Sequence, residues 1–157
     1  MSRIPPHNVK IERGVLGYLL LNVEDREHVT ELLDVLRDGS CFYRESHQRL
    51  YRSFKERFEN GYPCDNCTIG QIALNGDLLV PIDLVIDCCQ TPPLWYPYRN
   101  PLADECHPPV SEYVDRVVAL SDQRTAIAAL NEALNRAWDG DYDMMNARVL
   151  DTSAEVA

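Results

Sequence analysis

The sequence contains no long hydrophobic run. No apolar stretch approaches the roughly 20 residues that a helix needs to cross a bilayer. At its start, Met1-Ser2-Arg3 is followed by prolines rather than by the apolar stretch of a secretory signal peptide. We therefore expect a cytoplasmic protein with no membrane association.

Positive charge is also scarce. The 157 residues include 15 lysines and arginines against 25 aspartates and glutamates, for a formal net charge of -10. Proteins bind nucleic-acid backbones through an excess of Lys and Arg, so strong independent DNA binding is not expected. One cluster is locally basic: Arg44, Arg49, Arg52, Lys55 and Arg57. It alternates with Glu45, Glu56 and Glu59, which is typical of a solvated helix face.

Catalytic motifs are missing as well. The sequence has no Gly-x-x-x-x-Gly-Lys-[Ser/Thr] phosphate loop, no His-Glu-x-x-His pair and no Gly-x-Ser-x-Gly elbow. We predict that His7 packs or caps before the first helix and that His28 is exposed. We also predict that His47 packs and is hydrogen-bonded, while His107 lies in a proline-rich stretch. The chain is not expected to be an enzyme, and no catalytic or cofactor-binding residue is predicted.

Six cysteines without a secretory signal favour reduced thiols over a disulfide framework. Cys64-x-x-Cys67 has the spacing of a zinc-ligand pair. Four further residues could complete such a site: Cys88, Cys89, Cys106 and His107. Because adjacent cysteines chelate poorly, we interpret the cysteines as small buried hydrophobic residues, and a structural zinc site is the alternative.

What the sequence does contain is helical periodicity, in a composition of 45% hydrophobic and 25% charged residues typical of a globular protein. The first, third and fourth predicted helices cover about residues 8–21, 46–60 and 69–74. The second has Glu24 or Asp25 in its first turn and is marked by apolar residues from Val29 to Leu36. Thr68 is the expected cap of the fourth helix. The expected stops after the second, third and fourth helices contain Gly39, Gly61 and Gly76. The third helix has one apolar face, formed by Leu50, Tyr51, Phe54 and Phe58.

The second half begins with an apolar run at residues 79–89. Periodicity alone fits either a strand or a buried helix there, and the lack of any other strand signal favours a helix. Residues 91–109 hold six of the ten prolines and predict a loop. A long helix is predicted over about 110–138, with Ser111 as its cap and a stop at residues 139–141. A final helix over about 143–155 would then lie antiparallel to it as a hairpin.

Together these elements predict an all-α fold in a single domain over residues 1–157. A globular multi-helix head (about 8–90) and the proline-rich loop (91–109) precede an antiparallel helical hairpin (110–155). The first helix of the hairpin carries more large apolar residues than one antiparallel partner needs, which indicates self-association. These candidate interface residues are Ile127, Leu130, Leu134 and Trp138.

Several motifs follow one another in a recognisable order and spacing. They are Pro5-Pro6-His7 with Val15-Leu16-Gly17-x-Leu19-Leu20-Leu21, Cys41-Phe42-Tyr43-x-x-x-His47-x-x-Leu50-Tyr51, the run from Gly61 to Ile69, Gly76-Asp77-Leu78, Tyr113-Val114-x-x-Val117 with Arg124, and Leu150-Asp151-x-x-Ala154-Glu155. Over residues 5–78 and 111–155 the chain resembles the N-terminal domain of DnaB-type replicative DNA helicases. Residues 79–110 depart from that pattern. Cys64 and Cys67 stand where the family carries valine, which favours the buried-hydrophobe interpretation.

The resemblance implies an architectural role. Such domains pair through their hairpins and assemble as trimers of dimers into a collar on a hexameric motor, where they dock a DnaG-type primase and respond to a helicase loader. Without a phosphate loop, this chain would contribute no ATP hydrolysis. Two alternatives stay open: a free-standing phage or plasmid regulator that binds a helicase or a primase, and a small metal- or nucleic-acid-binding helical module.

Overall fold

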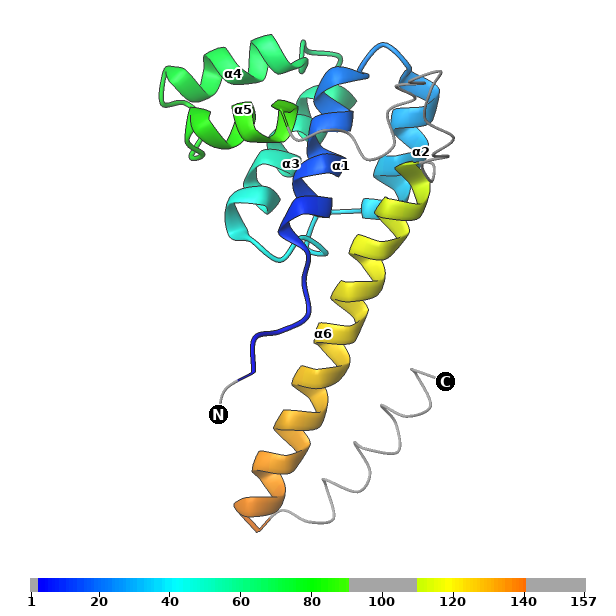
Figure 1. Cartoon of the computed structure of the whole chain (residues 1–157), viewed down its shortest axis with the longest axis vertical. Helices are drawn as coiled ribbons and strands as arrows, with labels where there is room; N and C mark the ends of the chain where they lie inside the picture. Colours follow the sequence, from blue (N-terminus) through cyan, green and yellow to red (C-terminus); the bar gives the residue numbers. More distant parts are fainter. Residues whose placement is uncertain (1–2, 91–109, 141–157) are drawn as a thin grey trace, which may run out of the picture. The chain divides into compact units, whose positions relative to one another are not determined.

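The computed structural model describes residues 3–90 and 110–140. These residues form α-helices and no β-strand (Figure 1), which confirms the predicted all-α class. The helices are α1 (Val9–Leu21), α2 (Arg26–Leu36), α3 (Glu45–Glu59), α4 (Asn66–Leu74), α5 (Ile82–Gln90) and α6 (Val110–Trp138). The predicted loop at 91–109 and the predicted helix at 143–155 lie outside the described residues.

The chain divides into two compact units. The first, which we call the head, runs from His7 to Val118 and contains α1 to α5 with the first turns of α6. The second contains residues 3–6 and α6 from Ala119 onward. No described helix combines the length and the apolar character that crossing a membrane would require.

Helix α1 provides the centre of the head, where it packs against α5, α3 and α4. It starts where predicted, because Asn8 accepts a hydrogen bond from the Ile11 N–H at 3.1 Å and so satisfies one free donor of the first turn. Its apolar residues recur at helical spacing and are buried: Ile11, Val15, Leu16, Leu19 and Leu20. One side of α1 therefore supplies much of the hydrophobic core.

Gly17 lets the backbones of α1 and α5 approach closely. A Cβ atom at this position would collide with the carbonyl oxygen of Cys88 on α5. The predicted helix in the 79–89 run is thus present as α5, beginning at Ile82, and it lies directly on the glycine of the Val15-Leu16-Gly17 motif. Glycine is required here for close approach, not for a turn.

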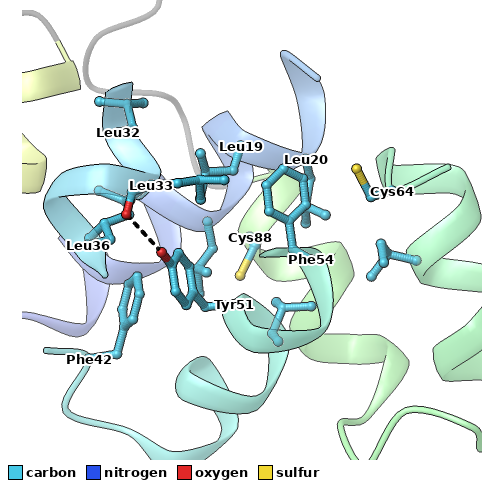
Figure 2. Close-up of a cluster of buried hydrophobic side chains, with 14 of the residues drawn as sticks. Leu19, Leu20, Leu32, Leu33, Leu36, Phe42, Tyr51, Phe54, Cys64 and Cys88 are labelled. Atoms are coloured by element: carbon cyan, nitrogen blue, oxygen red, sulfur yellow. Dashed lines mark hydrogen bonds between the residues drawn. The ribbon is translucent and has the colours of Figure 1, made fainter. Parts of the chain in front are cut away.

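Helix α3 buries the apolar face that its sequence predicts. Leu50, Tyr51, Phe54 and Phe58 are each at most 4% exposed. Figure 2 shows Tyr51 and Phe54 among the leucines of α1 and α2, with the Tyr51 hydroxyl donating to the Leu33 carbonyl. The Arg37 carbonyl lies closer, 2.8 Å from the same hydroxyl, so the two carbonyls share its one proton. Burial raises the pKa of Tyr51, so the hydroxyl keeps that proton and remains a donor.

A buried carboxylate connects α1 to the start of α3. Glu12, only 2% exposed, accepts the Tyr43 N–H at 2.9 Å with one oxygen. Its other oxygen lies 2.8 Å from Nδ1 of the fully buried His47. This confirms the prediction that His47 packs and is hydrogen-bonded. A buried carboxylate is tolerated only when such donors replace its lost hydration.

Two predicted helix caps are wrong. Helix α4 begins at Asn66 after the N-cap Asp65, and the Thr68 hydroxyl donates to the Asp65 carboxylate from inside the first turn. That hydrogen bond lowers the pKa of Asp65. Helix α6 already begins at Val110, so Ser111 lies within the helix. The Thr68 prediction for α4 overlooked Asp65, which lies three residues earlier. Aspartate is at least as favourable as threonine at an N-cap.

We expect Gly17→Ala to lower the free energy of unfolding by about 1–2 kcal/mol. Alanine gains up to about 1 kcal/mol in helix propensity, but the Cβ forces α5 away, and overpacking costs about 1–3 kcal/mol. Gly70→Ala is the matched control, because its Cβ would meet only Ile82 Cδ1, at an ordinary 3.5 Å. That variant should be as stable as the original chain or up to about 1 kcal/mol more stable. If urea denaturation gave the same change in the free energy of unfolding for both variants, the close contact between α1 and α5 would be contradicted.

Glu12→Ala is expected to destabilise the chain by about 2–4 kcal/mol. It leaves the Tyr43 N–H and the His47 ring buried without their acceptor, and each lost partner costs about 1–3 kcal/mol. The control is Glu59→Ala, since Glu59 is exposed and forms only a 3.8 Å pair with Lys55. That change should stay within about 0.5 kcal/mol in the same denaturation experiment. Similar losses in both variants would refute a special role for the buried carboxylate.

Candidate functional site

Each described histidine is engaged in packing or in a hydrogen bond. His47 contacts Glu12 as described above. The prediction that His28 is exposed is wrong: it is half-buried, and its Nδ1 lies 2.7 Å from the Tyr18 hydroxyl. His7 stacks on Tyr43 with ring centroids 4.0 Å apart, which agrees with a packing role. His107 lies outside the described residues.

The cysteines occupy three different environments. Cys64 and Cys88 are buried, as interpreted from the sequence, whereas Cys67 is exposed and Cys89 is half-buried. Burial raises the pKa of the Cys64 thiol and raises that of Cys88 to about 12. A thiol must lose its proton to bind a metal, so these two are poor ligands as they stand. In the described ranges, no three His, Cys, Asp or Glu side chains converge as a metal site would require.

The basic residues of α3 are engaged with neighbouring oxygens. The Arg49 guanidinium lies 2.7 Å from the Glu45 carboxylate, and Lys55 donates to the Arg37 carbonyl at 2.7 Å. Arg52 and Arg57 likewise donate to backbone carbonyls. The cluster therefore supports the interpretation of a solvated helix face and offers no preformed phosphate site.

The four candidate interface residues lie on one line of α6. Ile127, Leu130, Leu134 and Trp138 follow one another at spacings of three, four and four residues, which returns them to the same side of a helix. Their exposed fractions are 40%, 45%, 53% and 83% in that order. We call this line the exposed stripe. It places four large apolar side chains in solvent over three helical turns.

A second line of α6 was missed in the sequence. Four alanines follow the same spacing one residue before each member of the exposed stripe: Ala126, Ala129, Ala133 and Ala137. They are more buried than the stripe, and Ala133 is only 1% exposed. The spacing of the alanines was the available signal, but alanine carries little weight in a search for large apolar residues. Small side chains on one line permit close approach of another helix.

Polar contacts flank these lines. Glu132 and Arg136, one turn apart, form an exposed ion pair at 3.0 Å. Arg124 donates to the Pro6 carbonyl at 3.0 Å, which ties the segment before α1 to α6 within the second unit. The chemistry available on α6 is therefore apolar contact with a polar border, the usual composition of a protein–protein interface.

Comparisons with known proteins identify the family of the chain. The family model for the DnaB-like helicase N terminal domain matches residues 4–84. The replicative DNA helicase DnaC of Bacillus subtilis is 35% identical over 78 residues, which are 50% of this chain and 16% of that helicase. Replicative DNA helicase DnaB of Mycobacterium leprae is 34% identical over 68 residues, 43% of this chain and 11% of that protein. The chain thus matches less than a fifth of the length of either helicase.

A solved structure shares the fold. The crystal structure of the N-terminal domain of DnaB helicase from Mycobacterium tuberculosis superposes with a TM-score of 0.68 at 20% sequence identity. The superposition covers 94% of this chain and 99% of that one. The family match, which takes in half of the chain from the segment before α1 into α5, sets its identity. The chain belongs to the DnaB-like helicase N-terminal domain family, a non-catalytic domain associated with replicative DNA helicases.

Proposed function

We propose that this chain is an oligomerisation domain of a replicative DNA helicase and that the exposed stripe of α6 forms its dimer contact. The observation that carries the proposal is the row of four large apolar side chains, 40–83% exposed, along one side of α6. Single exposed leucines are ordinary on protein surfaces. A continuous row across three turns is the seam through which helices associate.

The alanine line supports this assignment. Each alanine lies next to a member of the exposed stripe, so the two lines form one broad apolar face of α6. Ala133 is buried within the chain and the other three alanines are half-buried, whereas the stripe is exposed. The face is therefore wider than the chain itself covers. A second copy related by a two-fold axis would present the same stripe and cover the remainder.

The rest of the proposed function comes from the family. By resemblance, such dimers assemble in threes on a hexameric motor, dock a DnaG-type primase and respond to a loader. We propose these partners for this chain too. The similar proteins are named as replicative DNA helicases, but the chain matches only 11–16% of their length. We therefore assign ATP hydrolysis and unwinding to another part of such a helicase, because this chain lacks a phosphate loop.

Leu130→Asp should abolish the dimer while leaving the helices formed. A buried carboxylate without a partner is strongly unfavourable at the centre of an apolar contact, so the dissociation constant should rise by about 100-fold or more. Light scattering across a concentration series measures the association. Circular dichroism on the same samples measures helix content, which should not change.

Ala128→Asp is the matched control. Ala128 is exposed on nearly the opposite side of α6, so the variant adds the same charge to the same helix outside the stripe. It should associate like the unaltered chain. If Leu130→Asp remained dimeric, or if both variants lost the dimer equally, the stripe would not be the contact surface.

A further inference from the structure

Helices α4 and α5 form a part of the head with no positive charge. Residues 58–98 contain no lysine, arginine or histidine, although the chain has 15 lysines and arginines in all. Most of this stretch folds as α4, the turn at residues 75–81 and α5, which lie side by side in Figure 1. We call these three elements the acidic lobe.

The inner side of the acidic lobe belongs to the core. Ile69 of α4 is fully buried, and Val85 and Cys88 of α5 are at most 2% exposed. The turn is equally well defined, because the Asp77 N–H donates to the Ile72 carbonyl and the Gly76 N–H to the Ala73 carbonyl. With Gly76 at a φ of +79°, these bonds form a Schellman motif. The predicted Gly76 stop is thus confirmed, and it fixes the side chains on both sides of the turn.

The outer side of the acidic lobe exposes large apolar side chains. Leu74, the last residue of α4, is 64% exposed, and Leu79, at the far end of the turn, is 79% exposed. On α5, Ile86 is 43% exposed. The backbone hydrogen bonds of Gly76 and Asp77 hold the turn without any contribution from the side chain of either leucine. Large apolar groups exposed on the described part of the head mark a candidate contact surface.

Carboxylates border these apolar groups. Asp77 lies in the turn between Leu74 and Leu79, and Asp83 and Asp87 share the exposed face of α5 with Ile86. Asp83 and Asp87 are like charges one turn apart on a helix, an arrangement that is mildly destabilising by itself. Arg49 of α3 reaches the Leu79 carbonyl at 3.4 Å, but its guanidinium is paired with Glu45. The outer side thus combines apolar side chains with a negative border.

We propose that the outer side of the acidic lobe is a docking surface for a positively charged amphipathic helix of another protein. Leucine or isoleucine side chains of that helix would contact Leu74, Leu79 and Ile86, and its lysines or arginines would face the three aspartates. The charge pattern selects this occupant. Nucleic acid and a second copy of the same lobe would both bring negative charge to a negative surface.

A synthetic peptide helix of about 14 residues, with leucines on one face and lysines on the other, tests the proposal. Titrated into the isotope-labelled full chain, it should produce its largest NMR shift changes between Leu74 and Asp87. Binding should weaken as salt is raised, because the charge contacts are screened. Replacing Asp77, Asp83 and Asp87 together with asparagine should raise the dissociation constant about tenfold, the combined effect of three screened contacts.

The matched control replaces Glu24, Glu27 and Glu31 with glutamine. These exposed acids lie on and just before α2, and their loss changes the net charge by the same amount. This variant should bind the peptide within about twofold of the unaltered chain. Leu79→Ser tests the apolar part and should weaken binding severalfold without unfolding the head, since the side chain is exposed.

Equal weakening in both triple variants would show that net charge alone attracts the peptide and would overturn the proposal. Shift changes centred on α2 or α6 would overturn it as well. Self-association through α6 is measured separately with Leu130→Asp. A negative result for the docking surface therefore does not count against the proposed dimer, and a negative result for the dimer does not count against the docking surface.

Discussion

The head depends on the hydrogen bonds of one buried carboxylate. Glu12 on α1 accepts from the Tyr43 backbone and lies against His47 of α3, so a single side chain fixes the start of α3 against α1. His7, two residues before α1, stacks on Tyr43 from the same region of the chain. Sequence motifs more than thirty residues apart are thus partners in one contact. In this chain the spacing between these segments therefore has a physical role, because the buried groups are satisfied only by one another.

A second constraint follows at the next turns of α1. Gly17 admits the backbone of α5, which buries one side of α5 against the core and leaves Asp83, Ile86 and Asp87 on the other. The close crossing therefore has a consequence at the surface: it determines which face of α5 the acidic lobe presents. A head in which α5 stood further from α1 would lose core packing and would turn this face differently.

The elements of the head could be predicted because each is marked locally. Apolar spacing located the helices, and glycine after asparagine located their ends, as at Gly76. What could not be predicted depends on neighbours distant in sequence. His28 is half-buried because Tyr18 of α1 lies beside it, and Cys67 is exposed although Cys64, one turn before it, is buried. The exposure of Leu79 could not be predicted either, because the sequence of an apolar run does not show which of its residues remain exposed after folding.

The long helix α6 shows where periodicity is informative and where it misleads. Its large apolar residues recur every three or four positions except for a gap of seven between Leu120 and Ile127, which suggests one continuous stripe. In the structure Val110, Val114 and Val117 are buried in the head core, whereas Leu130 and Leu134 lie on nearly the opposite side of the helix and are exposed. The average spacing of these apolar residues is shorter than the number of residues in one helical turn. Each successive residue therefore lies slightly further around the helix, and the line of apolar residues changes side along α6. Because of this change of side, the first turns of α6 pack in the core of the head, and its later turns expose apolar residues on another side of the helix. The self-association proposed for the exposed stripe would then not involve the side chains that form the core of the head.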